Sequence, residues 1–446
     1  MSLVDAVINR LSSSETQQKI LRNLFWAVAG KATQLLGTLL VGILVARYLG
    51  PDQYGLMSYV VSYVALFQIF ASFGLDSIEI REEAKHRDER DVLVGTAFYV
   101  KLMLAFVTIL LCVLTSLAME SDSLVTWMVA IYALSMVART FNVVRNFFMA
   151  IVDNELVVKS EIAATVVGAA LKMALLLFHF NVVWFVGATM VDLFILAAGY
   201  VLSYKMRIGG VGQWRFSCEK ALFLLKEAFP LMLTNAAVIV YQRIDQVMIG
   251  RMLDNASVGY FSVASRIVDV LIYVPFILAD TIIPVLVAKR EQSEELYSQK
   301  AQLFMNVAFW LTLLLAILTS LSSGWVMVCL FGGKYQASVP VLQLLAFKSA
   351  AMALSSCAGR MLIIEGLQRW AIFRDLLGCV VCITLNFILL PRYGVTAAAI
   401  TAILSVLTAG YFADALIPAY RHLFVRQSKA LFFGWRDLAH LKNLRK

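Results

Sequence analysis

The chain has 446 residues, of which 61% are hydrophobic and only 15% are charged, and its mean hydropathy is +0.80. Soluble globular proteins are about 45–50% apolar and about 25% charged. This composition excludes a soluble enzyme, a disordered chain and a small secreted disulfide scaffold. The net charge of +9 reflects membrane orientation rather than a nucleic-acid partner, because basic residues in a membrane protein collect on its cytoplasmic side.

Twelve apolar windows follow one another along the chain, and a membrane-spanning helix needs roughly 20 apolar residues. We therefore predict an all-α polytopic membrane protein with about 12 transmembrane helices. The predicted spans cover residues 24–46, 56–74, 93–117, 124–145, 160–178, 182–203, 228–249, 260–287, 304–330, 339–363, 372–390 and 394–418.

The basic residues alternate between the two sides of these spans. Most Lys and Arg residues lie in the N-terminal segment, in the links that follow even-numbered spans, and in the C-terminal tail. Only four lie in odd-numbered links, namely Arg47, Arg251, Lys334 and Arg392. By the positive-inside rule, both termini are predicted to be cytoplasmic.

Two links resemble each other and indicate an internal repeat. Arg47, Gly55 and Ser58 of the first link recur as Arg251, Gly259 and Ser262 of the seventh, at a constant offset of 204 residues. Six spans in each half would insert both halves the same way up, as in transporters built of parallel repeats. We interpret both links as turns on the periplasmic rim, with Gly55 and Gly259 allowing tight entry into the next helix.

The repeat predicts two six-helix lobes with short connections. The expected divisions are an N-terminal lobe (1–204), a cytoplasmic linker with an amphipathic segment (205–227), a C-terminal lobe (228–420) and a basic amphipathic cytoplasmic tail (421–446). The tail mixes basic and aromatic residues, which suits a helix lying on an anionic leaflet. Orientation-setting charge alone is the alternative interpretation.

Several patches, in this order, resemble the polysaccharide-repeat flippases called Wzx. These belong to the MOP superfamily, together with the MATE drug exporters and the MurJ-type lipid flippases. The patches are 45–55, 73–76 with 81–84, 225–230, 241–250, 258–266, 331–335 and 389–394. The resemblance spans nearly the whole chain, and it implies a MOP/MATE-like fold.

This resemblance also implies a function and partners. The expected activity is translocation of an undecaprenyl-diphosphate-linked oligosaccharide from the cytoplasmic to the outer leaflet of the bacterial inner membrane. Membrane lipids, the polysaccharide polymerase and the assembly machinery are the implied partners. Whether the product is O-antigen of lipopolysaccharide, capsule or exopolysaccharide is left open, as is coupling to protons, to sodium or to neither.

Ionisable groups inside spans are costly in lipid and are therefore functional candidates. Fixed cations in a water-filled cavity suit a diphosphate, since Arg offers planar bidentate donors to phosphate. The candidate substrate-binding residues are Lys31, Gln34, Gln242, Arg243, Arg266 and Arg360. Carboxylates that take up and release an ion could drive reopening of the substrate cavity to the opposite side of the membrane. The candidates for ion coupling are Asp245, Asp269 and Asp280.

Structural roles compete with several of these assignments. Arg266 and Asp269 are i, i+3 neighbours that could pair within their helix, Asp245 could tie two helices together, and Lys31 could snorkel. For Lys101, Arg139 and Lys348 we favour structural or snorkelling roles.

Three other functions remain as alternatives. A MATE-like exporter of organic cations and a MurJ-type flippase for the peptidoglycan precursor share the predicted fold. A membrane enzyme is disfavoured because the links are short and no catalytic constellation or phosphate-binding loop is present. The four histidines are far apart in sequence, so we expect no metal or cofactor.

Overall fold

The computed structural model describes residues 15–120 and 122–439, which are almost entirely helical and contain no strand. Their internal contacts divide them into two units. The first contains the described residues up to Tyr48 together with Tyr63–Asn235, and the second contains Leu49–Ser62 together with the described residues from Ala236 onward. The lobe boundaries expected from the repeat stay a prediction.

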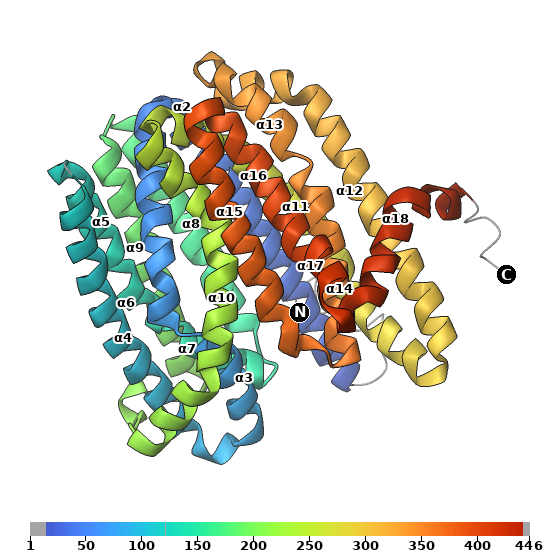
Figure 1. Cartoon of the computed structure of the whole chain (residues 1–446). Helices are drawn as coiled ribbons and strands as arrows, with labels where there is room; N and C mark the ends of the chain where they lie inside the picture. Colours follow the sequence, from blue (N-terminus) through green and yellow to red (C-terminus); the bar gives the residue numbers. More distant parts are fainter. Residues whose placement is uncertain (1–14, 121, 440–446) are drawn as a thin grey trace. The chain divides into compact units, whose positions relative to one another are not determined.

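The first unit is built from the helices of the first half of the chain (Figure 1). They are α2 (Glu15–Ser72), α3 (Leu75–Lys85), η1 (Arg87–Glu89), α4 (Arg90–Met119), α5 (Ser123–Ala133), α6 (Ser135–Thr140), α7 (Asn142–Ala150), α8 (Glu155–Leu177), α9 (Val182–Arg207), η2 (Val211–Gln213) and α10 (Cys218–Met252). Helices α2 and α10 are long, and each contributes residues to both units.

The second unit contains the remaining helices. They are α11 (Asn255–Gln292), α12 (Glu294–Phe331), η3 (Gly333–Ser338), α13 (Val339–Leu345), α14 (Lys348–Glu365), η4 (Gln368–Trp370), α15 (Ala371–Tyr393), α16 (Val395–Leu407), the π-helical turn η5 (Thr408–Phe412), α17 (Ala413–Leu416), η6 (Pro418–Tyr420) and α18 (Arg421–Ala439). The C-terminal α18 packs along α12 (Figure 1).

Eleven helical stretches of the described residues are long and apolar enough to cross a membrane. The first of them, Thr33–Lys85, is 53 residues long, which is more than twice the length that one crossing needs. It bends at Gly50, where φ is 73° and ψ is 174°, and it contains residues 33–46 of the first predicted span and the whole of the second. The all-helical polytopic class is confirmed, whereas the number twelve and the side of the termini stay predictions.

Two predicted spans are broken into shorter helices. The window 124–145 contains α5, α6 and the start of α7, and the window 339–363 contains α13 and part of α14. Sequence hydropathy does not reveal such breaks, because a window of roughly 20 residues averages over them.

In the two repeated links the helical backbone is interrupted at Gly50 and at residues 253–254, not at the repeated glycines. Gly55 lies inside α2, and Gly259 lies in the second turn of α11. A Cβ atom on Gly55 would overlap the carbonyl oxygen of Asn255, and one on Gly259 would overlap that of Pro51. The contact is therefore reciprocal, since Pro51 and Asn255 are themselves related by the repeat offset. The two glycines let equivalent backbones touch within the second unit.

Candidate functional site

Asp245 is the predicted site residue with the clearest environment. It lies on α10 and is 1% exposed. Asn386 donates its side-chain N–H to Asp245 Oδ1 at 2.6 Å, and the Cys382 thiol lies 3.3 Å from the same oxygen. Both partners come from one face of α15, because residues four apart on a helix are neighbours.

This polar cluster is incompletely satisfied. Asp245 Oδ2 and Asn386 Oδ1 are buried and have no hydrogen-bond partner among the described residues. The half-buried Lys348, at the start of α14, supplies a positive charge that acts on Asp245. Buried polar atoms are nearly always paired, so these two oxygens are exceptions within an otherwise hydrogen-bonded cluster.

The neighbours of Asp245 on α10 divide between buried and exposed positions. Gln246 is buried and accepts a hydrogen bond from Ser62 of α2. Gln242 and Arg243 are exposed, so the structure does not bring them into the Asp245 cluster. Gln242 and Gln246, which are four residues apart on α10, therefore differ in burial.

The other predicted residues lie outside this cluster. The Arg266 guanidinium stacks over the ring of Tyr54 at 5.8 Å, within the second unit. Asp269 and Gln34 are exposed, and Arg360 is half-buried. The side chains of Lys31 and Asp280 lie outside the described residues. The substrate-binding and ion-coupling assignments of these residues stay predictions.

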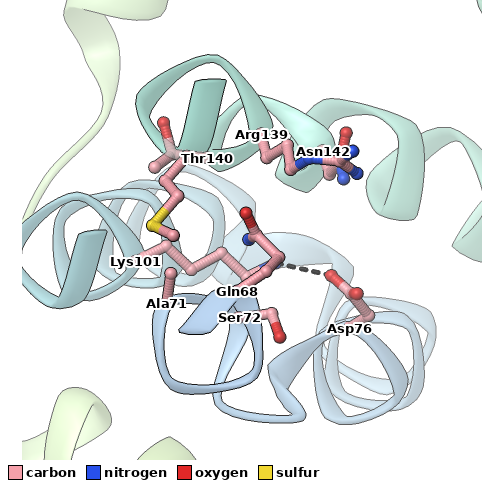
Figure 2. A pocket seen from close by; sticks show the side chains of 9 residues that line it. Gln68, Ala71, Ser72, Asp76, Lys101, Arg139, Thr140 and Asn142 are labelled. Atoms are coloured by element: carbon pink, nitrogen blue, oxygen red, sulfur yellow. Dashed lines mark hydrogen bonds and ion pairs between the residues drawn. The ribbon is translucent and has the colours of Figure 1, made fainter. Parts of the chain in front are cut away.

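A second polar site, which the sequence did not predict, lies in the first unit. A cavity of about 160 Å³ is bounded by α2, α3, α4, α6 and α7. Its lining residues are Gln68, Ala71, Ser72, Asp76, Lys101, Met136, Arg139, Thr140 and Asn142. Figure 2 shows Lys101 extending to Asp76 on one side of the cavity, with Arg139 and Asn142 on another.

Lys101 is the centre of an ionic cluster beside this cavity. Its ammonium nitrogen lies 2.7 Å from Asp76 Oδ1 and 2.6 Å from Glu79 Oε1, with a side chain only 3% exposed. Asn146 donates to Asp76 at 2.9 Å and to Glu79 at 2.6 Å. The structural role favoured for Lys101 fits these contacts. The sequence pattern that could have indicated this cluster is the i, i+3 spacing of Asp76 and Glu79, which places two acids on one helix face.

The fold resembles those of solved MOP superfamily proteins. An inward-facing MATE family multidrug transporter superposes with a TM-score of 0.65 at 17% identity, covering 90% of this chain and 96% of the other. The lipid II flippase MurJ, in an inward closed conformation, gives 0.65 at 14% identity, covering 92% of each chain. A MOP superfamily transporter from Pyrococcus furiosus gives 0.58 at 14% identity, covering 96% and 99%. No curated protein sequence matched the chain.

These likenesses define a class and a family. The chain is a multi-pass membrane protein with the fold of MOP superfamily transporters and flippases. The family model described as polysaccharide biosynthesis protein matches residues 20–289, more than half of the sequence. The chain belongs to this polysaccharide biosynthesis family, as the ordered patches indicated.

Proposed function

We propose that the protein is a flippase of the bacterial inner membrane. Its substrate is an undecaprenyl-diphosphate-linked oligosaccharide repeat unit, which it moves from the cytoplasmic to the outer leaflet by alternating access. The observation that carries this proposal is the polysaccharide biosynthesis family match on a MOP-type helical fold. A lipid-linked sugar is the polysaccharide precursor that requires a membrane protein of this kind.

Basic and polar residues on the helices are assigned to the diphosphate and sugars. Lys31, Gln34, Gln242, Arg243, Arg266 and Arg360 form this set. The Arg266 guanidinium lies over the ring of Tyr54 at 5.8 Å, and a planar guanidinium is the side-chain group that matches a phosphate through two parallel hydrogen bonds. Exposed Arg243 and Gln242 are available for contact with a passing headgroup.

Asp245, Asp269 and Asp280 are assigned to ion coupling. They would bind and release the ion whose gradient drives the protein back to the conformation that accepts substrate. Asp245 is the strongest of the three, because its buried Oδ2 has no hydrogen-bond partner within the described part of the chain and Asn386 offers a second such oxygen. A charged carboxylate buried in this way is costly, so its occupancy by a proton or cation changes the stability of the contact between α10 and α15. Binding and release of that ion would favour different conformations.

Complementation tests the substrate class and the role of Asp245 together. The chain would be expressed in a strain that lacks its repeat-unit flippase, and surface polysaccharide would be measured. We expect restoration by the natural chain and by Asp88→Asn, which removes an exposed carboxylate. Asp245→Asn keeps the side-chain shape but not the titratable group, and we expect a loss of at least tenfold.

The two transport alternatives give different outcomes in the same genetic background. Rescue of a strain depleted of its lipid II flippase, without restoration of surface polysaccharide, would assign the protein to the peptidoglycan precursor. Increased resistance to organic cations, without either rescue, would assign it to drug export. Membrane abundance of each variant, measured by immunoblot, separates inactivity from failed insertion.

A further inference from the structure

Helix α3 carries three carboxylates on one face. Asp76, Glu79 and Glu83 follow one another at spacings of three and four residues, which align on a helix. The Asp76 side chain is 50% exposed and lines the cavity in Figure 2. The Glu79 side chain is 1% exposed, and Glu83 as a residue is 3% exposed. The face therefore leads from a cavity to a deeply buried carboxyl group.

The charges along this face do not balance. Lys101 contacts both Asp76 and Glu79 at 2.7 and 2.6 Å, and Asn146 donates to the same two acids. Both carboxyl oxygens of Glu83 are buried without a hydrogen-bond partner among the described residues. One ammonium group is thus shared by two carboxylates, and the third carboxylate has no direct partner.

The groups around Glu83 come from several packed elements. Electrostatic interactions join Glu83 to Glu79 on α3, Lys101 on α4 and Tyr204 on α9. The other charged groups on these elements and their neighbours are the Arg81–Glu82 pair on α3, His86 after it, the Arg90–Asp91 pair on α4, Arg145 on α7 and Glu227 on α10. Several of the cations are held by other acids. Arg81 is 2.8 Å from Glu82 and 2.9 Å from Glu227, and Arg145 is 3.2 Å from Glu161.

We propose that Glu83 binds a proton in this conformation, loaded from the cavity along Asp76 and Glu79. The proton comes from solvent that enters the cavity, forms the O–H bond of the neutral acid, and returns to solvent when the helices rearrange. An ionised carboxylate without a hydrogen bond or direct cation is costly to bury, and protonation removes that charge. This site is in the first unit and is separate from Asp245.

A metal ion fits this place less well than a proton. The Lys101 ammonium already occupies the position between Asp76 and Glu79. Within the described residues, no three acidic, histidine or cysteine side chains are placed to hold a metal ion.

Infrared spectroscopy of the purified full-length protein tests this proton directly. At neutral pH, subtracting the Glu83→Gln spectrum from that of the natural chain should leave the carbonyl band of a protonated acid, and this band should shift in D2O. Glu82→Gln is the matched control, because Glu82 lies next in the chain and is paired with Arg81. Its difference spectrum should contain carboxylate bands. Carboxylate bands in the Glu83→Gln difference would overturn the proposal.

A chemical probe of the natural chain gives an answer even if Glu83→Gln fails to fold. Dicyclohexylcarbodiimide is apolar and modifies protonated carboxyl groups, and mass spectrometry of peptides locates the adduct. We expect an adduct on Glu83 and none on Glu82, with labelling of Glu83 decreasing as the pH is raised. Absence of the Glu83 adduct across the pH range would contradict the assignment.

Discussion

Asp245 and Lys101 are both buried charged residues, but their contacts differ in kind. Lys101 is saturated by Asp76, at 2.7 Å, and by Glu79, at 2.6 Å. Asp245 has one oxygen bound by Asn386 and one without a partner among the described residues. A saturated charge stabilises a single arrangement, whereas an unsaturated one gains by taking up an ion. These environments separate a structural residue from a candidate for coupling.

The ion pairs of Lys101 predict that this single residue contributes strongly to the stability of the protein. Lys101→Met leaves two carboxylates without their cation, and loss of one partner of a buried ion pair costs about 3–5 kcal/mol. We expect a correspondingly lower free energy of unfolding in detergent at neutral pH. Lys85→Met is the control, since the Lys85 side chain is 60% exposed and 3.9 Å from Glu82, and such surface pairs are worth about 0–1 kcal/mol. Equal losses in both variants would contradict this account.

The sequence predicts individual candidate residues more readily than the contacts that they make. Asp245 was identifiable because an acid within an apolar span is rare. Its contact with Asn386 was not, because it joins helices 141 residues apart in sequence. The acids of α3 follow directly after a predicted span, where they resemble a solvated link. Only packing of α4 and α7 against α3 reveals that Glu79 and Glu83 are buried.

Among the elements, the crossing of α2 and α11 depends on glycine at both Gly55 and Gly259. Each glycine faces the backbone carbonyl of the partner helix, and a backbone atom cannot rotate away as a side chain can. The offset of 204 residues anticipated that the two segments are equivalent. The offset did not predict that the two segments contact each other, because an internal repeat shows only that two segments have similar sequences.

Substitution of these glycines should separate packing from helix propensity. Gly55→Ala and Gly259→Ala each place a methyl group against backbone, and overpacking costs about 1–3 kcal/mol. Gly324→Ala lies on α12 and faces open space among the described residues, where alanine is favoured over glycine by roughly 0.5–1 kcal/mol. We expect lower unfolding midpoints for the first two variants and an unchanged or higher midpoint for the third. The opposite order would refute the crossing.

Over the whole molecule, hydropathy and charge position predicted the helical membrane class, and the fold confirms it. The count of twelve stays a prediction: eleven stretches of the described residues are long and apolar enough to span, and the first of them leaves helical geometry at Gly50. The distribution of basic residues makes a separate prediction about orientation. Reporter fusions should place both termini in the cytoplasm and residues 332–338 outside. A reporter at either terminus that is active only in the periplasm would reverse the assigned orientation.

The measurement that tests the central claim most directly is translocation by the purified protein in liposomes. A fluorescent undecaprenyl-diphosphate oligosaccharide would be placed in both leaflets, and its accessibility to a membrane-impermeant quencher would be followed over time. We predict protein-dependent exchange between leaflets that an ion gradient accelerates, with Asp245→Asn losing the acceleration and Asp88→Asn retaining it. No exchange above protein-free liposomes, with or without a gradient of protons or sodium, would contradict the assignment as a flippase.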